Sequence, residues 1–242
     1  MTNSTANVHA ASAAIGRKIA VCSTSFIVNP MEAVEINTGA NPLASVIWLH
    51  GLGADGHDFE PIVSELELDQ PVRFVFPHAP VRPVTINQGM RMRAWYDILQ
   101  FGPGPEDEAG VRASQKLLET LIAAERARGA GSIVLAGFSQ GGAIVLQTAL
   151  RHGERLAGVL ALSTYLPLHR TLEAEGSAAN RDVPIFMAHG QYDDIIPLQR
   201  AEQSRQLLER LGYKVQWQTY PMPHSVCPEE IADISAFLRK IL

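Results

Sequence analysis

The sequence predicts an α/β fold in which helices cover both faces of a mostly parallel central sheet. Short apolar runs rich in β-branched residues recur along the chain, segments with helical periodicity lie between them, and 46% of the 242 residues are hydrophobic. Strands that alternate with helices form parallel sheets that are buried on both faces. Ligands bind such sheets at the carboxyl ends of the strands, so functional residues are expected in the loops that follow strands.

Six strands and three helices are predicted along the chain. The apolar runs predict buried strands at 45–49, 73–76, 132–136, 158–162, 185–188 and 215–219. Apolar residues at helical spacing predict helices through 111–122 and 231–241, and a third helix is expected over 143–151. Residues 77–110 are rich in Pro and Gly and have no clear periodicity, so they are expected either to contribute to the site or to connect elements.

The amino-terminal part of the chain has a different composition. Residues 1–16, rich in Ala, Ser and Asn, are predicted to be a disordered tail. The apolar residues that follow Lys18 are predicted to begin an edge strand. No internal repeat or linker divides the rest, so residues 17–242 are predicted to form one domain.

The composition argues against several classes of protein. The formal net charge is −5 and the basic residues are scattered, so no nucleic-acid partner is expected. No apolar run approaches the ~20 residues of a membrane-spanning helix, so no membrane span is predicted. Cys22 and Cys227 do not resemble a disulfide framework and suit a reducing compartment, which predicts a cytoplasmic protein. Neither H-E-x-x-H nor a Cys–His cluster occurs, so no metal site is predicted.

A glycine-rich loop follows the strand predicted at 45–49. Gly51, Gly53 and Gly56 satisfy G-x-G-x-x-G, the spacing of dinucleotide-binding loops. That fingerprint expects an acidic residue about 20 positions later, where this chain has Phe-Pro-His at 76–78. A nucleotide site is therefore disfavoured, and the glycines need another explanation.

A second glycine-rich loop follows the strand predicted at 132–136. Gly137, Ser139 and Gly141 form G-x-S-x-G between this strand and a predicted helix. In that context the serine occupies a sharp turn that pushes its hydroxyl away from the sheet, which predicts a nucleophile. The alternative is that Ser139 only caps the helix.

A serine nucleophile requires a histidine base and an acid that orients it. In the α/β-hydrolase order Ser, Asp, His, the candidates are Asp193, which follows the strand at 185–188 with Asp194 beside it, and His224, which follows the last strand. His189 is a competing base, but it precedes the acid. The backbone N–H groups of Leu52 and Gln140 are predicted to form the oxyanion hole.

Five segments together resemble the phospholipase/carboxylesterase family, and above all its bacterial carboxylesterase II members, to which the acyl-protein thioesterases are related. They are HGLGADG at 50–56, HAPVRPVT at 78–85, AWYD at 94–97, AGFSQGG at 136–142 and HGQYDD at 189–194. The resemblance covers about residues 43–242. One departure is Pro223, where the family usually has glycine before the catalytic histidine.

The resemblance implies an α/β-hydrolase with little or no lid that needs no cofactor. It implies that Ser139 is the nucleophile, Asp193 the orienting acid and His224 the base, and that Trp95 and Tyr165 line the substrate pocket. The expected substrate is a small molecule, an ester of short to medium chain length. The alternatives are an acyl-protein thioesterase or lysophospholipase that uses the same triad, and a non-catalytic binding protein on a hydrolase scaffold. Whether two copies form a homodimer stays open.

Overall fold

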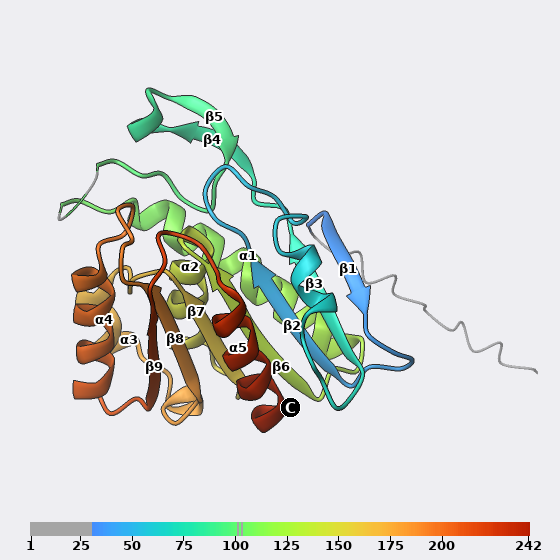
Figure 1. Ribbon diagram of the computed structural model, residues 1–242. Coiled ribbons are helices and arrows are strands. Elements are labelled where there is room, and N and C mark those ends of the chain that lie inside the picture. The colour runs from blue at the N-terminus through green and yellow to red at the C-terminus, as the bar shows by residue number, and fades with distance from the viewer. Residues whose placement is uncertain (1–30, 101, 103) are drawn as a thin grey trace, which may run out of the picture.

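The computed structural model describes residues 31–100, 102 and 104–242 (Figure 1). The tail predicted over 1–16, the edge strand predicted to begin after Lys18, and Cys22 lie outside the described residues.

A central sheet of seven strands, in the order β1-β3-β2-β6-β7-β8-β9, organises the described chain. Its strands are β1 (Ala33–Asn37), β2 (Ala44–Leu49), β3 (Val72–Pro77), β6 (Ser132–Phe138), β7 (Gly158–Leu162), β8 (Ile185–Gly190) and β9 (Val215–Tyr220). All neighbouring strands are parallel except the edge pair β1–β3, which is antiparallel. The predicted α/β fold with a mostly parallel sheet is confirmed, and each of the six predicted strands is present.

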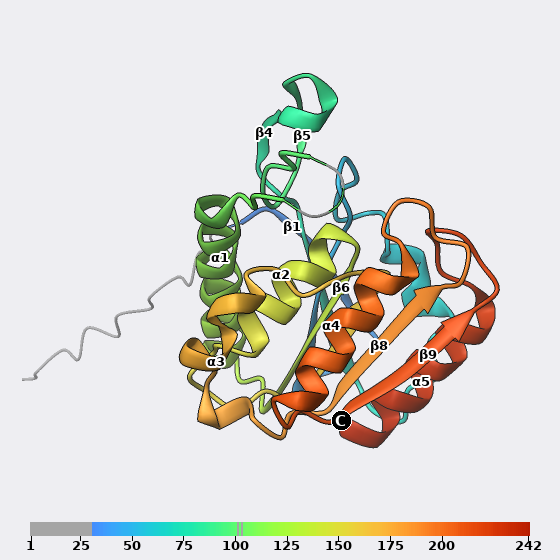
Figure 2. The same ribbon diagram turned by 90° about the vertical axis from the view of Figure 1, so that its left-hand side faces the viewer.

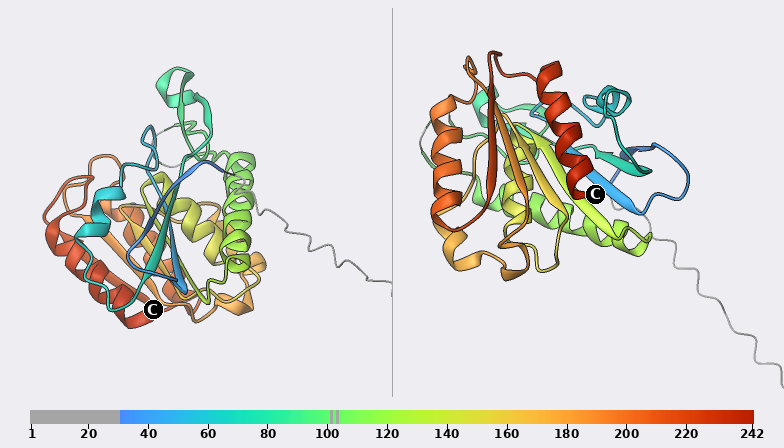
Figure 3. Two further views of the ribbon diagram at one scale, coloured as in Figure 1. Left: turned by 90° about the vertical axis from the view of Figure 1, so that its right-hand side faces the viewer. Right: turned by 60° about the horizontal axis from the view of Figure 1, so that its bottom comes forward.

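Helices cover both faces of this sheet, as Figures 2 and 3 show. They are α1 (Glu108–Ala127), α2 (Gln140–Ala149), α3 (Leu172–Glu175), α4 (Leu198–Arg210) and α5 (Pro228–Ile241), with short 3₁₀ turns η1 (Glu60–Ser64), η2 (Thr85–Asn87), η3 (His169–Thr171) and η4 (Ala178–Asn180). Side chains of α1 to α4 pack in one apolar core, whereas α5 and η1 pack in the other.

Strand β2 illustrates why the central strands read as unbroken apolar runs. All six of its residues are buried, because successive side chains point to opposite faces and both faces are covered. Ile47 and Leu49 belong to the core beneath α1 and α2. Val46 and Trp48 belong to the core beneath α5.

The region without periodicity contains an antiparallel hairpin. Strands β4 (Val81–Val84) and β5 (Met90–Arg93) pair only with each other and project above the carboxyl edge of the main sheet (Figure 1). The sequence of this hairpin lacks the apolar pattern of a buried strand, because β4 contains Pro83 and β5 alternates Met and Arg. Helix α4 was also not predicted, since its buried face consists of Ala201, Ser204 and Leu208 and offers little apolar periodicity.

One carboxyl group is buried in the first turn of α5. Glu230 is fully buried, and neither of its oxygens reaches full hydrogen-bond geometry with a partner among the described residues, although the backbone N–H of Cys227 favours the ionised form. Burial raises the pKa of this carboxyl to about 8. None of the helices in the described ranges is long and apolar enough to cross a membrane.

Candidate active site

Ser139 occupies the turn between β6 and α2 in a strained backbone conformation. Its φ of 54° and ψ of −119° lie in a region that residues other than glycine rarely adopt, at a cost on the order of 1–3 kcal/mol. The side chain makes no capping hydrogen bond to α2, although Ser139 is the N-cap residue of that helix. The geometry therefore does not support the alternative in which the serine only caps the helix. Such strain is typical of a residue that a turn must hold out toward a ligand.

The two glycines of the G-x-S-x-G motif are required by close backbone packing. A Cβ atom on Gly141 would lie 2.3 Å from the carbonyl oxygen of Leu49, at the end of the neighbouring strand β2. A Cβ atom on Gly137 would lie 2.6 Å from the carbonyl carbon of Gly141. Only glycine at both positions lets α2 begin this close to the sheet.

His224 and Asp193 form a direct contact beside this turn. His224 follows β9, Asp193 follows β8, and the Nδ1 of the imidazole lies 2.7 Å from the Oδ2 of the carboxylate. Pro223 is compatible with this contact, and its carbonyl oxygen accepts a hydrogen bond from the N–H of Ser225 at 2.9 Å. The departure from glycine at this position therefore does not separate the histidine from the acid.

Hydrogen bonds hold the Asp193 carboxylate in its ionised form. Its Oδ1 accepts the backbone N–H groups of Ile195 at 2.9 Å and Ile196 at 2.8 Å. Burial opposes ionisation, but the hydrogen bonds from His189, His224 and Ile196 outweigh it and leave the pKa of Asp193 well below its ordinary value. A carboxylate that stays charged is what a partner of an imidazolium requires. The neighbouring Asp194 is exposed.

His189 supports Asp193 from the buried side. This histidine is fully buried, and its Nε2 lies 2.8 Å from the carbonyl oxygen of Ile196 and 3.2 Å from the Oδ2 of Asp193. Because a carbonyl oxygen can only accept, Nε2 carries the proton. A buried donor in this position orients the acid and cannot reach a substrate, so the histidine considered as a competing base has the geometry of a positioning residue.

The turn that carries Ser139 also lies beside His224. The ring of Phe138, the residue before the serine, contacts the His224 imidazole at a centroid distance of 4.7 Å. Within the described part of the chain, the Ser139 hydroxyl makes no hydrogen bond. Catalytic contacts of this kind are often long without substrate and tighten in the substrate complex.

The two predicted oxyanion donors are available. Neither the N–H of Leu52 nor that of Gln140 has an acceptor among the described residues, whereas the next N–H, that of Gly53, donates to the carbonyl oxygen of Arg93 at 2.9 Å. Gln140 is the first residue of α2, where a backbone N–H has no acceptor within the helix. Free N–H groups at a helix start favour developing negative charge.

His50 fixes the loop that contains Leu52. Its Nε2 accepts the backbone N–H of Ala79 at 3.0 Å, so Nδ1 carries the proton and donates to the carbonyl oxygen of Gly51 at 2.7 Å. Burial lowers the pKa of His50 to about 4, which keeps the ring neutral and preserves this tautomer near pH 7. Sequence reasoning assigned no role to His50, although it begins the HGLG segment.

Trp95 and the side chain of Gln140 connect the two glycine-rich loops. The indole Nε1 of Trp95 donates to the carbonyl oxygen of His50 at 2.9 Å. The Gln140 amide accepts the backbone N–H of Trp95 and donates to the carbonyl oxygen of Tyr96, both at 2.7 Å. Trp95 is only 1% exposed, so it offers little surface to a substrate in this conformation.

Tyr165, the second residue predicted to line the pocket, is partly exposed. Its hydroxyl lies 2.8 Å from that of Tyr96, and the guanidinium of Arg200 stacks 3.4 Å from its ring centroid. Thr164, the preceding residue, donates its hydroxyl proton to the carbonyl oxygen of Ser139 at 2.7 Å. Contact between substrate and either Trp95 or Tyr165 stays a prediction.

The loop with G-x-G-x-x-G spacing leads into the short 3₁₀ turn η1. A dinucleotide site would place the pyrophosphate at the start of a longer α-helix, so the loop geometry also disfavours that alternative. The described residues contain no group of three or more His, Cys, Asp or Glu side chains arranged to hold a metal ion.

Comparisons with known proteins agree with this geometry. The sequence model of the phospholipase/carboxylesterase family matches residues 31–242. A protein of Gibberella zeae named acyl-protein thioesterase 1 is 43% identical over 213 residues, which cover 82% of this chain and 91% of that protein. A protein of the same name from Mycosarcoma maydis is 39% identical over 90% of this chain and 97% of its own length. The crystal structure of Zea mays acyl-protein thioesterase 2 is similar with a TM-score of 0.78 and 27% identity, over 87% of this chain and 98% of that one.

Proposed function

The chain belongs to the phospholipase/carboxylesterase family of serine hydrolases, and from this membership we propose that it is an acyl-protein thioesterase with Ser139 as nucleophile. The relatives named above favour this function over the short-chain carboxylesterase expected first from the sequence. The observation that carries the catalytic part of the proposal is the 2.7 Å contact between His224 and Asp193 beside the strained Ser139 turn.

In the proposed cycle, His224 takes the hydroxyl proton as Ser139 attacks the thioester carbonyl. The N–H groups of Leu52 and Gln140 hold the oxyanion, and Asp193 stabilises the imidazolium. The tetrahedral intermediate expels the thiol, which receives its proton from His224. Water activated by the same histidine then hydrolyses the acyl-enzyme and regenerates the serine. No step requires a cofactor.

Exposed apolar side chains support a long acyl chain as part of the substrate. Those that follow the carboxyl ends of the strands or lie on the hairpin are Val81, Met90, Leu99, Tyr192 and Ile195, which are between 38% and 68% exposed. Tyr192 and Ile195 flank Asp193 in the sequence, so they lie beside the candidate site and offer apolar contacts to an acyl chain bound there. Each methylene that leaves water there contributes about 0.8 kcal/mol, so a long chain gains more than a short one.

The proposal is tested by comparing acyl chains and leaving groups in one set of assays. We measure kcat/KM for p-nitrophenyl esters from acetate to palmitate below their micelle concentrations, and for a peptide that carries a palmitoyl thioester. The value is expected to rise along the ester series because each added methylene is buried, and the thioester peptide is expected to be cleaved. Ser139→Ala, which keeps the binding surface, is the control that separates enzymatic from spontaneous hydrolysis.

An optimum at or below about eight acyl carbons, with the thioester peptide left intact, would instead support the short-chain carboxylesterase, because further methylenes would then stay in water. If purified, folded wild-type protein turns over none of these substrates, the result would support a non-catalytic binding protein on this scaffold.

A further inference from the structure

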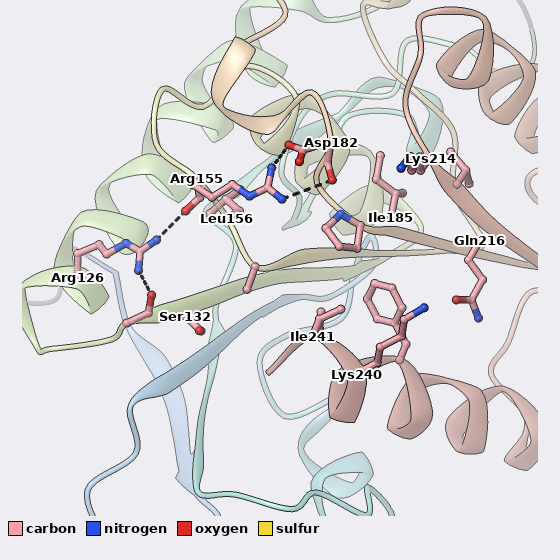
Figure 4. Close-up of a pocket in the computed structure, with 15 residues that line it drawn as sticks. Arg126, Ser132, Arg155, Leu156, Asp182, Ile185, Lys214, Gln216, Lys240 and Ile241 are labelled. Carbon is pink, nitrogen blue, oxygen red and sulfur yellow. Dashed lines mark hydrogen bonds and ion pairs between the residues drawn. The ribbon is translucent and has the colours of Figure 1, made fainter.

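A cavity lies at the opposite end of the sheet from the candidate active site. Its volume is about 750 Å³, within the range of small-molecule sites. It is bounded by the chain segments that enter β6, β7, β8 and β9 and by the last turns of α5 (Figure 4). The mechanism proposed above uses none of the residues that line it.

The inner wall of this cavity is apolar. Leu156, Ile185 and Phe237 contribute to the lining and are at most 4% exposed, so they are part of the folded core. Pro184 and Ile241 extend the apolar surface toward the opening. A ligand with a hydrocarbon part would remove this surface from water.

The rim of the cavity is positively charged. Four cations, Arg126, Arg155, Lys214 and Lys240, line it together with one carboxylate, that of Asp182, whereas the whole chain has a net charge of −5. A local charge of this sign in an acidic protein attracts anions.

The two arginines are already engaged within the protein. Arg126 donates to the carbonyl oxygens of Ala130, Gly131 and Arg155 at 2.7 to 2.9 Å. The Nε of Arg126 lies 3.9 Å from a carboxylate oxygen of Glu154, and Arg155 forms an ion pair with Asp182. These contacts, some of them drawn in Figure 4, fix one end of the rim.

The two lysines have no such partners. Among the described residues, no hydrogen bond or ion pair involves the ammonium group of Lys214 or Lys240. Figure 4 shows them on opposite sides of the cavity, Lys214 at the start of β9 and Lys240 near the end of α5. An unpaired ammonium group on either side of an apolar wall can pair with an anionic head while the wall contacts its chain.

We propose that this cavity binds an organic anion with an apolar chain, of which a fatty carboxylate is the simplest example. The proposal rests on the lining residues alone and does not depend on the hydrolase chemistry. If the proposed function is correct, the acids that it releases belong to the same chemical class.

The test uses the wild-type protein with ¹³C-labelled isoleucine methyl groups and sodium decanoate below its micelle concentration. Ile185 and Ile241 report on this cavity, and Ile195 and Ile196 report on the candidate active site. Decanoate is expected to shift the Ile185 and Ile241 signals saturably. Two further probes separate the roles of chain and charge: decanol has the same chain without the charge, and inorganic phosphate has charge without the chain. Both are expected to bind at least about threefold more weakly than decanoate.

Matched variants separate the cavity from non-specific adsorption. Replacing both Lys214 and Lys240 by Gln is expected to weaken decanoate binding by about three- to tenfold, since an exposed ion pair contributes modestly. Lys116→Gln, an exposed lysine on α1, is expected to leave it unchanged. The proposal fails if the Ile185 and Ile241 signals do not move, if decanol binds as tightly as decanoate, or if the double variant binds like the wild type.

Discussion

The Nδ1 of His224 lies 2.7 Å from the Oδ2 of Asp193, although 31 positions of sequence separate the two residues. They meet because β8 and β9 are adjacent and parallel, so the loops that follow both strands leave the same edge of the sheet. The same carboxylate accepts two backbone N–H groups through its other oxygen, which fixes its orientation. The acid is therefore held before any substrate arrives.

The neighbouring carboxylates provide a matched test of this arrangement. Asp193→Asn is expected to lower kcat by at least ~100-fold, because an amide neither stabilises an imidazolium nor holds its tautomer. Asp194→Asn, at an exposed position, is expected to cost less than ~10-fold. Steady-state kinetics on both variants checks this, and the reverse ranking would assign the acid to Asp194.

The close approach of α2 to β2 predicts a strong effect of one added methyl group. Gly141→Ala would place a Cβ 2.3 Å from a backbone oxygen that cannot move aside, so we expect a loss of about 3 kcal/mol or more in the free energy of unfolding. Gly153→Ala is the control, because no atom lies within 4 Å of the added Cβ. Urea unfolding measures both. Equal stability of the two variants would mean that the turn can relax.

The buried Glu230 predicts a fall in stability as the pH rises. Its pKa is raised from an ordinary 4.5 to about 8 in the folded state, so between these values the folded protein holds a proton that the unfolded chain has lost. Stability then decreases by up to about 1.4 kcal/mol per pH unit. His50, whose pKa falls from 6.5 to about 4, contributes the opposite slope, but only below pH 6.5. Between pH 6.5 and 8 the slope comes from Glu230 and from the exposed His57, whose pKa is raised by its hydrogen bond with Glu60.

The measurement is the free energy of unfolding in urea at pH 6.5 and pH 8. The wild type is expected to be less stable at pH 8 by about 1.6 kcal/mol, and Glu230→Gln to lose most of this difference. Glu229→Gln, at the exposed preceding position, is expected to keep it. If the free energy of unfolding of Glu230→Gln depends on pH as in the wild type, another titratable group causes the dependence.

The sequence predicted the parallel sheet because strands such as β2 and β7 are buried on both faces and therefore read as continuous apolar runs. The edge strand β1 and the β4–β5 hairpin could not be found in this way. Each lies at the margin of the fold, where packing does not impose an apolar pattern.

Only part of the candidate site, too, could be predicted from the sequence. Ser139, Asp193 and His224 could be selected because each has a local signal, a motif or a position after a strand. His50 and His189 also follow predicted strands, but this position does not reveal that they support the Leu52 loop and Asp193, and Thr164 has no local signal. They became apparent only once the loops were brought together in space. The similarity to acyl-protein thioesterases changes the proposed substrate from a short-chain ester to an acyl thioester, and it leaves the proposed triad unchanged.

The central claim, that Ser139 is an activated nucleophile, is tested most directly with a fluorophosphonate label followed by peptide mapping. Such reagents bond to a serine hydroxyl only where a base and an oxyanion hole activate it. We expect one label per chain in the wild type, on the peptide that contains Ser139, and none in Ser139→Ala. Folded wild-type protein that stays unlabelled, or carries the label on another serine, would contradict the account.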